Sequence, residues 1–108
     1  MKRQMTPGER EFCRTWFVKR DAEGTLAFLT EDVGFVGTGA DEMASGRQQM
    51  AGYLAQDIRE IPEPFECDLS PIYEQPVSDG IYNMSADLTL KNSKYTWYLR
   101  AFFTLVLS

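Results

Sequence analysis

Apolar residues recur at helical spacing in the first part of the chain. Phe12, Trp16 and Phe17 fall on one side of a helix, and charged residues fall largely on the other. Thr6-Pro7 has the form of a helix start, because threonine caps well and proline suits the first helical position. The pattern predicts a helix from there to Arg20-Asp21.

A short helix, a strand and a loop are predicted next. Asp21 is suited to cap the second helix, in which Leu26 and Leu29 turn inward. Residues 33–36 have the composition of a strand that its glycine weakens. Residues 38–44 are predicted to be a loop, and this region lacks the spacing of a dinucleotide fingerprint or a P-loop.

Ser45 is expected to cap a third helix, which ends at Pro62 because proline cannot continue a helix. One face of this helix combines apolar side chains with a carboxylate: Met50, Tyr53, Leu54, Asp57 and Ile58. The rest of the chain has the period of strands, at residues 65–73, 80–90 and 95–107. Pro71 interrupts the first of them, which indicates an edge or a kink.

A tight hairpin joins the last two strands. If Asn92-Ser93 is a two-residue turn, Leu90 faces Tyr95 and Leu88 faces Trp97. One sheet face then carries Tyr82, Met84, Ala86, Leu88, Leu90, Trp97, Leu99, Ala101, Phe103 and Leu105. The other carries Asn83, Ser85, Asp87, Thr89, Thr96, Tyr98, Arg100, Phe102 and Thr104. The first face is predicted to lie under the helices.

These elements predict an α+β fold, a cone-like curved antiparallel sheet with three helices on its concave face. The strand that contains residues 102–107 is very apolar, and such an edge is normally paired. A final strand is therefore expected to be missing or supplied by a partner chain. The length of 108 residues predicts a single domain. An alternative interpretation is that this domain is the N-terminal part of a longer protein.

The chain resembles the SnoaL-like domains of the nuclear-transport-factor-2-like superfamily. The residues that carry the likeness are Trp16-Phe17, Arg20-Asp21, residues 26–32 and 35–37, Gly46, Arg100 and Thr104. Members of this family are polyketide cyclases, isomerases, dehydratases and non-catalytic ligand-binding or sensory domains. The resemblance implies a cone with an apolar pocket and a homodimer formed through the outer face of the sheet. The chain departs from the catalytic members at Val36-Gly37, which occupies the first-strand region where ketosteroid isomerases place their basic aspartate.

Composition and charge argue against several classes of partner and of catalytic mechanism. The net charge of −5 argues against nucleic acid and anionic membrane surfaces as partners. The absence of histidine excludes Ser-His-Asp and Cys-His catalysis. Cys13 and Cys67 fit no metal spacing and are expected to be reduced structural thiols. No metal or cofactor is predicted, and the chain start lacks an apolar signal core, so a cytoplasmic location is expected.

Two aspartates are candidate bases. Asp57 in an apolar cone would have its pKa raised by desolvation, but the pattern favours an exposed carboxylate or one paired with Arg59 or Arg47. Asp87 is predicted to lie opposite Tyr98 and diagonal to Arg100. Such a trio is more often a cross-strand ion pair than a site.

The candidate ligand-binding residues are Trp16, Phe35, Met50, Tyr53, Trp97, Leu99 and Arg100. The leading hypothesis is a non-catalytic domain that binds a small, largely apolar molecule or serves as a sensory or dimerisation module. The alternative is a small lyase, isomerase or cyclase with Asp57 or Asp87 as base and Tyr53 or Tyr98 as donor to an oxyanion. A third hypothesis is a purely structural dimerisation domain whose cone is filled with side chains and leaves no cavity.

Overall fold

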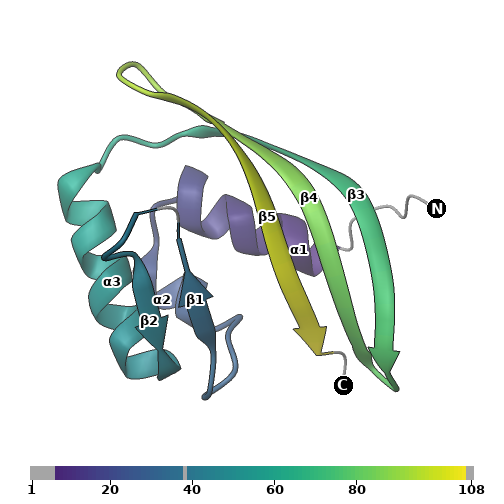
Figure 1. The fold of residues 1–108 in the computed structure, drawn as a ribbon. Coiled ribbons are helices and arrows are strands. Elements are labelled where there is room, and N and C mark those ends of the chain that lie inside the picture. The colour runs from purple at the N-terminus through teal and green to yellow at the C-terminus, as the bar shows by residue number, and fades with distance from the viewer. Residues whose placement is uncertain (1–6, 38, 107–108) are drawn as a thin grey trace.

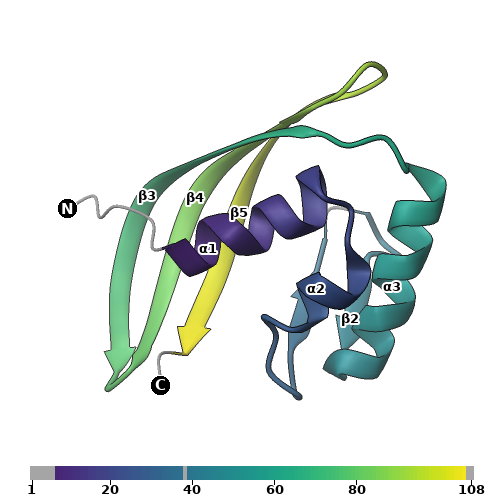
Figure 2. The same cartoon turned by 180° about the vertical axis from the view of Figure 1, so that it is seen from behind.

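A computed structural model describes residues 7–37 and 39–106. The elements are α1 (Pro7–Cys13), a π-helix η1 (Arg14–Val18), α2 (Ala22–Leu26), β1 (Gly34–Val36), β2 (Met43–Ser45), α3 (Gly46–Glu60), β3 (Glu66–Ser78), β4 (Ile81–Lys91) and β5 (Thr96–Val106). The three long strands form a curved antiparallel sheet in the order β3-β4-β5. Helix α1 lies on its concave side, and α2, α3 and the β1–β2 hairpin form a second unit beside it, which we call the helical unit (Figures 1 and 2).

Helices form in the three predicted regions, but the first ends at Val18 rather than at Arg20-Asp21, and the second ends at Leu26, so Leu29 lies outside it. The first runs through α1 and η1 without a break, although its expected cap at Thr6 lies outside the described residues. Asp21 caps α2, because its side chain accepts a hydrogen bond from the backbone N–H of Gly24. At the start of α3 the capping differs from the expectation. Ser45 makes no side-chain cap bond, and its backbone N–H donates instead to Gln49 Oε1.

The loop predicted at residues 38–44 is partly wrong. Residues Met43–Ser45 form strand β2, which pairs antiparallel with β1 so that Phe35 lies opposite Ala44. This pairing buries Ala44 and turns Phe35 inward toward α3. The predicted strand at residues 33–36 is confirmed as β1, over Gly34–Val36.

The hairpin register is shifted by two residues from the prediction. Leu90 pairs with Trp97, and Asp87 pairs directly with Arg100. The turn contains four residues, because Asn92 Oδ1 accepts hydrogen bonds from the backbone N–H groups of both Lys94 and Tyr95. A shift of two preserves the alternation of sides, so each side chain still lies on its predicted face.

Strand β3 is an edge strand with a bulge, as its proline indicates. The register shifts between Pro71 and Tyr73, and again between Pro76 and Ser78. The first bulge inserts Ile72 and turns Tyr73 to the outer face of the sheet. At the opposite edge, β5 pairs with β4 alone within the part of the chain that the structure describes.

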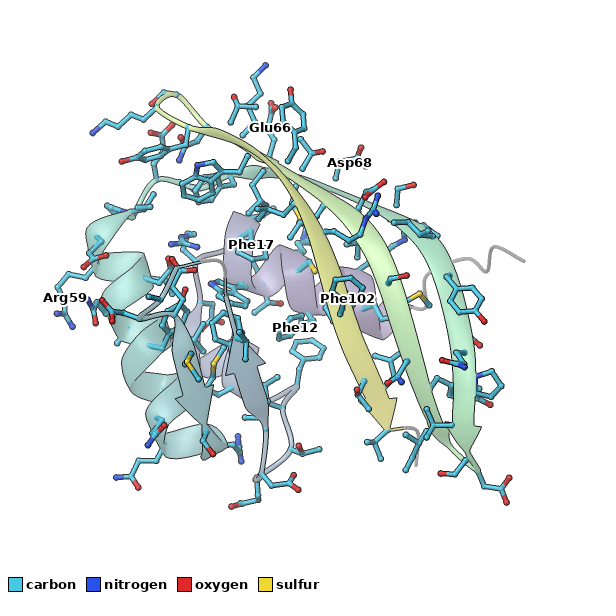
Figure 3. The ribbon with its side chains drawn as sticks, viewed as in Figure 1. Phe12, Phe17, Arg59, Glu66, Asp68 and Phe102 are labelled. Atoms are coloured by element: carbon cyan, nitrogen blue, oxygen red, sulfur yellow. The ribbon has the colours of Figure 1, made fainter. Side chains whose placement is uncertain are left out.

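The core consists of two clusters. The first lies between the sheet and α1 and contains Cys13, Phe65, Leu69, Met84, Ala86, Leu88 and Leu90. The second lies within the helical unit and contains Trp16, Ala44, Met50 and Leu54. Phe12 and Phe17 pack against both clusters, and Figure 3 shows these two rings between the sheet and the second unit. They are the apolar link between the two halves of the domain.

Candidate functional site

An aromatic group from three elements lies inside the helical unit. The Trp16 ring stacks on Phe17 with centroids 4.6 Å apart. Phe35 and Tyr53 lie 4.8 Å apart and both contact Trp16. Trp16 is buried and the other three rings are half-buried. The structure therefore brings together four of the predicted binding residues, because Met50 belongs to the same cluster.

Burial changes the pKa of the Tyr53 phenol. Desolvation, together with the nearby carboxylates of Asp57 and Glu42, raises the pKa of the Tyr53 phenol to about 12. The phenol therefore stays protonated throughout the physiological range. Its neutral hydroxyl is suited to donate a hydrogen bond rather than to act as a base.

Asp57 is held by partners that the sequence prediction did not name. Its Oδ2 accepts from Trp16 Nε1 at 3.0 Å and from Arg20 at 3.1 Å. The expected pairing with Arg59 or Arg47 is wrong: Arg59 points away from the body of the molecule (Figure 3), and Arg47 donates to the carbonyl of Leu26. One of the two carboxylate oxygens of Asp57 is therefore engaged by partners within the fold.

Arg20 is the organising residue of this network. Its guanidinium also donates to the carbonyl oxygens of Trp16, Asp57 and Ile61, and it lies 5.5 Å from the Phe65 ring centroid. The backbone of Arg20 has φ of 53°, in the left-handed region that non-glycine residues rarely adopt. The hydrogen bonds hold this conformation and join the end of the first helix to the end of α3.

The remaining predicted binding residues lie elsewhere. Trp97 and Leu99 are on the inner face of β5 and pack against the sheet cluster, but Trp97 is only half-buried because β5 is an edge strand. Arg100 points to the opposite, outer face, where it forms an exposed ion pair with Asp87 at 3.2 Å. Arg100 therefore does not share the space lined by Trp16 and Tyr53.

The outer face of the sheet has exposed aromatic side chains. Tyr98 and Phe102 are 80% and 78% exposed, and Tyr73 and Val106 are also exposed. An open hollow of about 440 Å³ lies at this part of the sheet, and its lining residues are Tyr73, Gln75, Asn83, Met84, Ser85, Phe102, Phe103 and Thr104. Tyr73 and Gln75 were not among the predicted site residues. The proline in β3, which signals the bulge, is the one sequence feature that pointed to a change of face there.

Comparison with known proteins identifies the fold. No protein-family model matches the chain, and no curated protein matches its sequence. Its structure is similar to that of a proposed calcium/calmodulin-dependent protein kinase type II association domain from Thiobacillus denitrificans, with a TM-score of 0.72 and 15% sequence identity. The match covers 92% of this chain and 81% of the other. It shows that the two chains share a fold, an α+β architecture with a curved antiparallel sheet.

The similarity confirms the predicted architecture at the level of the fold. Membership of the nuclear-transport-factor-2-like superfamily, and of its SnoaL-like domains, stays a prediction. Within the described residues, none of the helices has the length and apolar character needed to cross a membrane.

Proposed function

We propose that this chain is a non-catalytic association domain, in which the outer face of the β3–β4–β5 sheet binds a second copy of the chain. The observation that carries the proposal is the exposure of Tyr98 and Phe102 beside Tyr73 and Val106 on that face. Monomeric proteins rarely expose grouped aromatic side chains, and aromatic residues are enriched at protein interfaces. The similarity to a proposed association domain supports the same function.

The charges on the outer face suit a twofold contact. Asp87 and Arg100 pair across adjacent strands, and both side chains are more than half exposed. In an isologous interface the same surface of each copy contacts the other, so Arg100 of one copy can approach Asp87 of the second. Exchange of these partners would offset part of the repulsion between two chains of net charge −5.

Hydroxyl-radical footprinting tests the proposal. Oxidation of Tyr98 and Phe102 should fall several-fold as protein concentration rises, because association covers them. Val36 and Met43, which are exposed on the β1–β2 hairpin, serve as internal controls and should remain unchanged. Equal oxidation of Tyr98 and Phe102 at all concentrations would contradict an interface on this face.

A second candidate function is binding of a small apolar molecule on the inner side of β5. The observation that favours it is that the inward-facing residues of β5 are only half-buried: Trp97, Leu99, Ala101, Phe103 and Leu105. Buried inner residues are the rule on the neighbouring strand β4, so β5 retains apolar surface available to a ligand.

Tryptophan fluorescence tests this second candidate. Titration with an uncharged naphthalene probe should shift Trp97 emission in a saturable way, and Leu99→Arg should weaken that binding at least tenfold. Thr104→Arg, which places the same charge on the outer face, is the matched control and should leave it unchanged. A non-saturable signal, or equal loss in both variants, would rule out the inner site.

A further inference from the structure

A small side chain lies between two exposed rings on the outer face of the sheet. Ser85 of β4 pairs with Tyr73 of β3 on one side and with Phe102 of β5 on the other, so the three residues form one row across the sheet. Tyr73 and Phe102 are 51% and 78% exposed, whereas Ser85 is half-buried. All three residues line the hollow of about 440 Å³. Ser85 thus forms the floor of a slot whose two walls are aromatic.

The slot has the width of one aromatic ring. Strands β3 and β5 both neighbour β4, and adjacent strands lie about 4.8 Å apart, so the backbones at Tyr73 and Phe102 are about 10 Å apart. A further ring seated midway over Ser85 would lie about 5 Å to the side of each wall. Aromatic pairs are favourable at centroid separations of about 4.5–7 Å. Among the described residues that line the hollow none is charged, which also suits an apolar ring.

The ion pair of the outer face selects the orientation of a second copy. When two sheets associate face to face with twofold symmetry, the axis lies in the plane between them. An axis that runs across the strands sets each strand on its own counterpart, so Arg100 meets β5 of the second copy and does not reach Asp87. An axis parallel to the strands, between β4 and β5, instead sets β5 of one copy on β4 of the other and Arg100 on Asp87.

The same orientation brings Phe102 to the slot. Phe102 pairs with Ser85 in the row of the sheet two residues from the row of Arg100 and Asp87, and both rows point to the outer face. We infer, on the basis of the association proposed above, that Phe102 of each copy inserts over Ser85 of the other, between the rings of Tyr73 and Phe102. The two insertions are related by the axis and form one cluster of four rings.

Acidic side chains on β3 favour this orientation as well. Glu66 and Asp68 are exposed on the outer side of β3 (Figure 3). With the axis between β4 and β5, the β3 strands of the two copies lie on opposite sides of it, about 14 Å apart within the plane of the contact. This separation exceeds the screening length of about 8 Å at physiological ionic strength. Repulsion between the acidic strands of the two copies is therefore largely screened.

Isotope-filtered nuclear Overhauser spectroscopy tests the insertion on the wild-type protein. Equal amounts of carbon-13-labelled and unlabelled chain are mixed, and only contacts between the two kinds of chain are recorded. We expect cross-peaks from the Phe102 ring to the β-protons of Ser85 and to the ring of Tyr73. A dimer without these cross-peaks would overturn the insertion and leave the proposed association standing. A wild type that sediments as a monomer at the concentration of the experiment would overturn both.

A pair of variants tests the slot separately. Ser85→Leu places a branched side chain where the inserted ring would lie, and should raise the dissociation constant of the dimer about tenfold. Ser70→Leu makes the same change at an exposed residue of β3, outside the overlap of β5 with β4, and should leave it nearly unchanged. Wild-type affinity in Ser85→Leu, or equal weakening in both variants, would contradict the insertion. The wild-type cross-peaks decide the question even if Ser85→Leu fails to fold.

Discussion

Both faces of the β3–β4–β5 sheet carry apolar side chains on β5, but for different reasons. On the inner face, Leu88 and Leu90 of β4 are buried against α1, and the apolar residues of β5 extend the same layer. On the outer face, β4 carries the polar side chains Asn83, Ser85, Asp87 and Thr89, while β5 exposes Tyr98 and Phe102. The inner side chains hold the fold, and the outer aromatic side chains have no such role.

The largest expected effect is a difference between the two faces in how much their side chains contribute to the free energy of unfolding. Leu90→Ala removes a side chain that is 1% exposed and should lower the free energy of unfolding by about 3 kcal/mol. Phe102→Ala should change it by less than about 0.5 kcal/mol, because the ring is exposed in a single copy. Urea denaturation at low protein concentration measures both. Equal losses would mean that the outer ring is part of the core.

The Arg20 network can be broken next. Arg20→Met removes the partner of Asp57 and leaves the carbonyl of Ile61 without these donors, so it should cost about 2–3 kcal/mol. Arg59→Met is the matched control on the exposed side of α3 and should be near neutral. If both variants unfold at the same urea concentration as the wild type, the network contributes nothing to holding the helical unit.

The phenol of Tyr53 gives a smaller effect at high pH. Its folded pKa of about 12 lies above its ordinary value of 10, so the folded state retains the proton longer than the unfolded state. The corresponding stability is present below pH 10 and is lost as pH rises toward 12. In Tyr53→Phe, the ultraviolet titration should lose a tyrosinate signal near pH 12 and the stability should decline less across that range. Loss of a signal near pH 10 instead would place Tyr53 in solvent.

The alternation of residues was sufficient to predict the sheet faces, but it could not predict the register. A period of two is unchanged by a shift of two residues, so Leu90 kept its face while its partner changed from Tyr95 to Trp97. The turn length depends on how the Asn92 side chain bonds the backbone. Spacing along the chain does not contain that information.

Two other kinds of feature could not be predicted from the sequence: very short strands and contacts between residues far apart in the chain. Strand β2 has three residues, too few to establish a period, and its existence depends on pairing with β1. The contact between Arg20 and Asp57 joins two helix ends that no local pattern relates.

Sedimentation velocity of the wild type and Phe102→Asp tests the central claim most directly. The wild type should sediment as a dimer at tens of micromolar, and the variant as a folded monomer, because a charge on the outer face opposes its contact with a second copy. Val36→Asp adds the same charge at another exposed apolar residue, 76% exposed on β1, and should remain dimeric. A monomeric wild type, or a dimer that survives Phe102→Asp, would contradict association through this face.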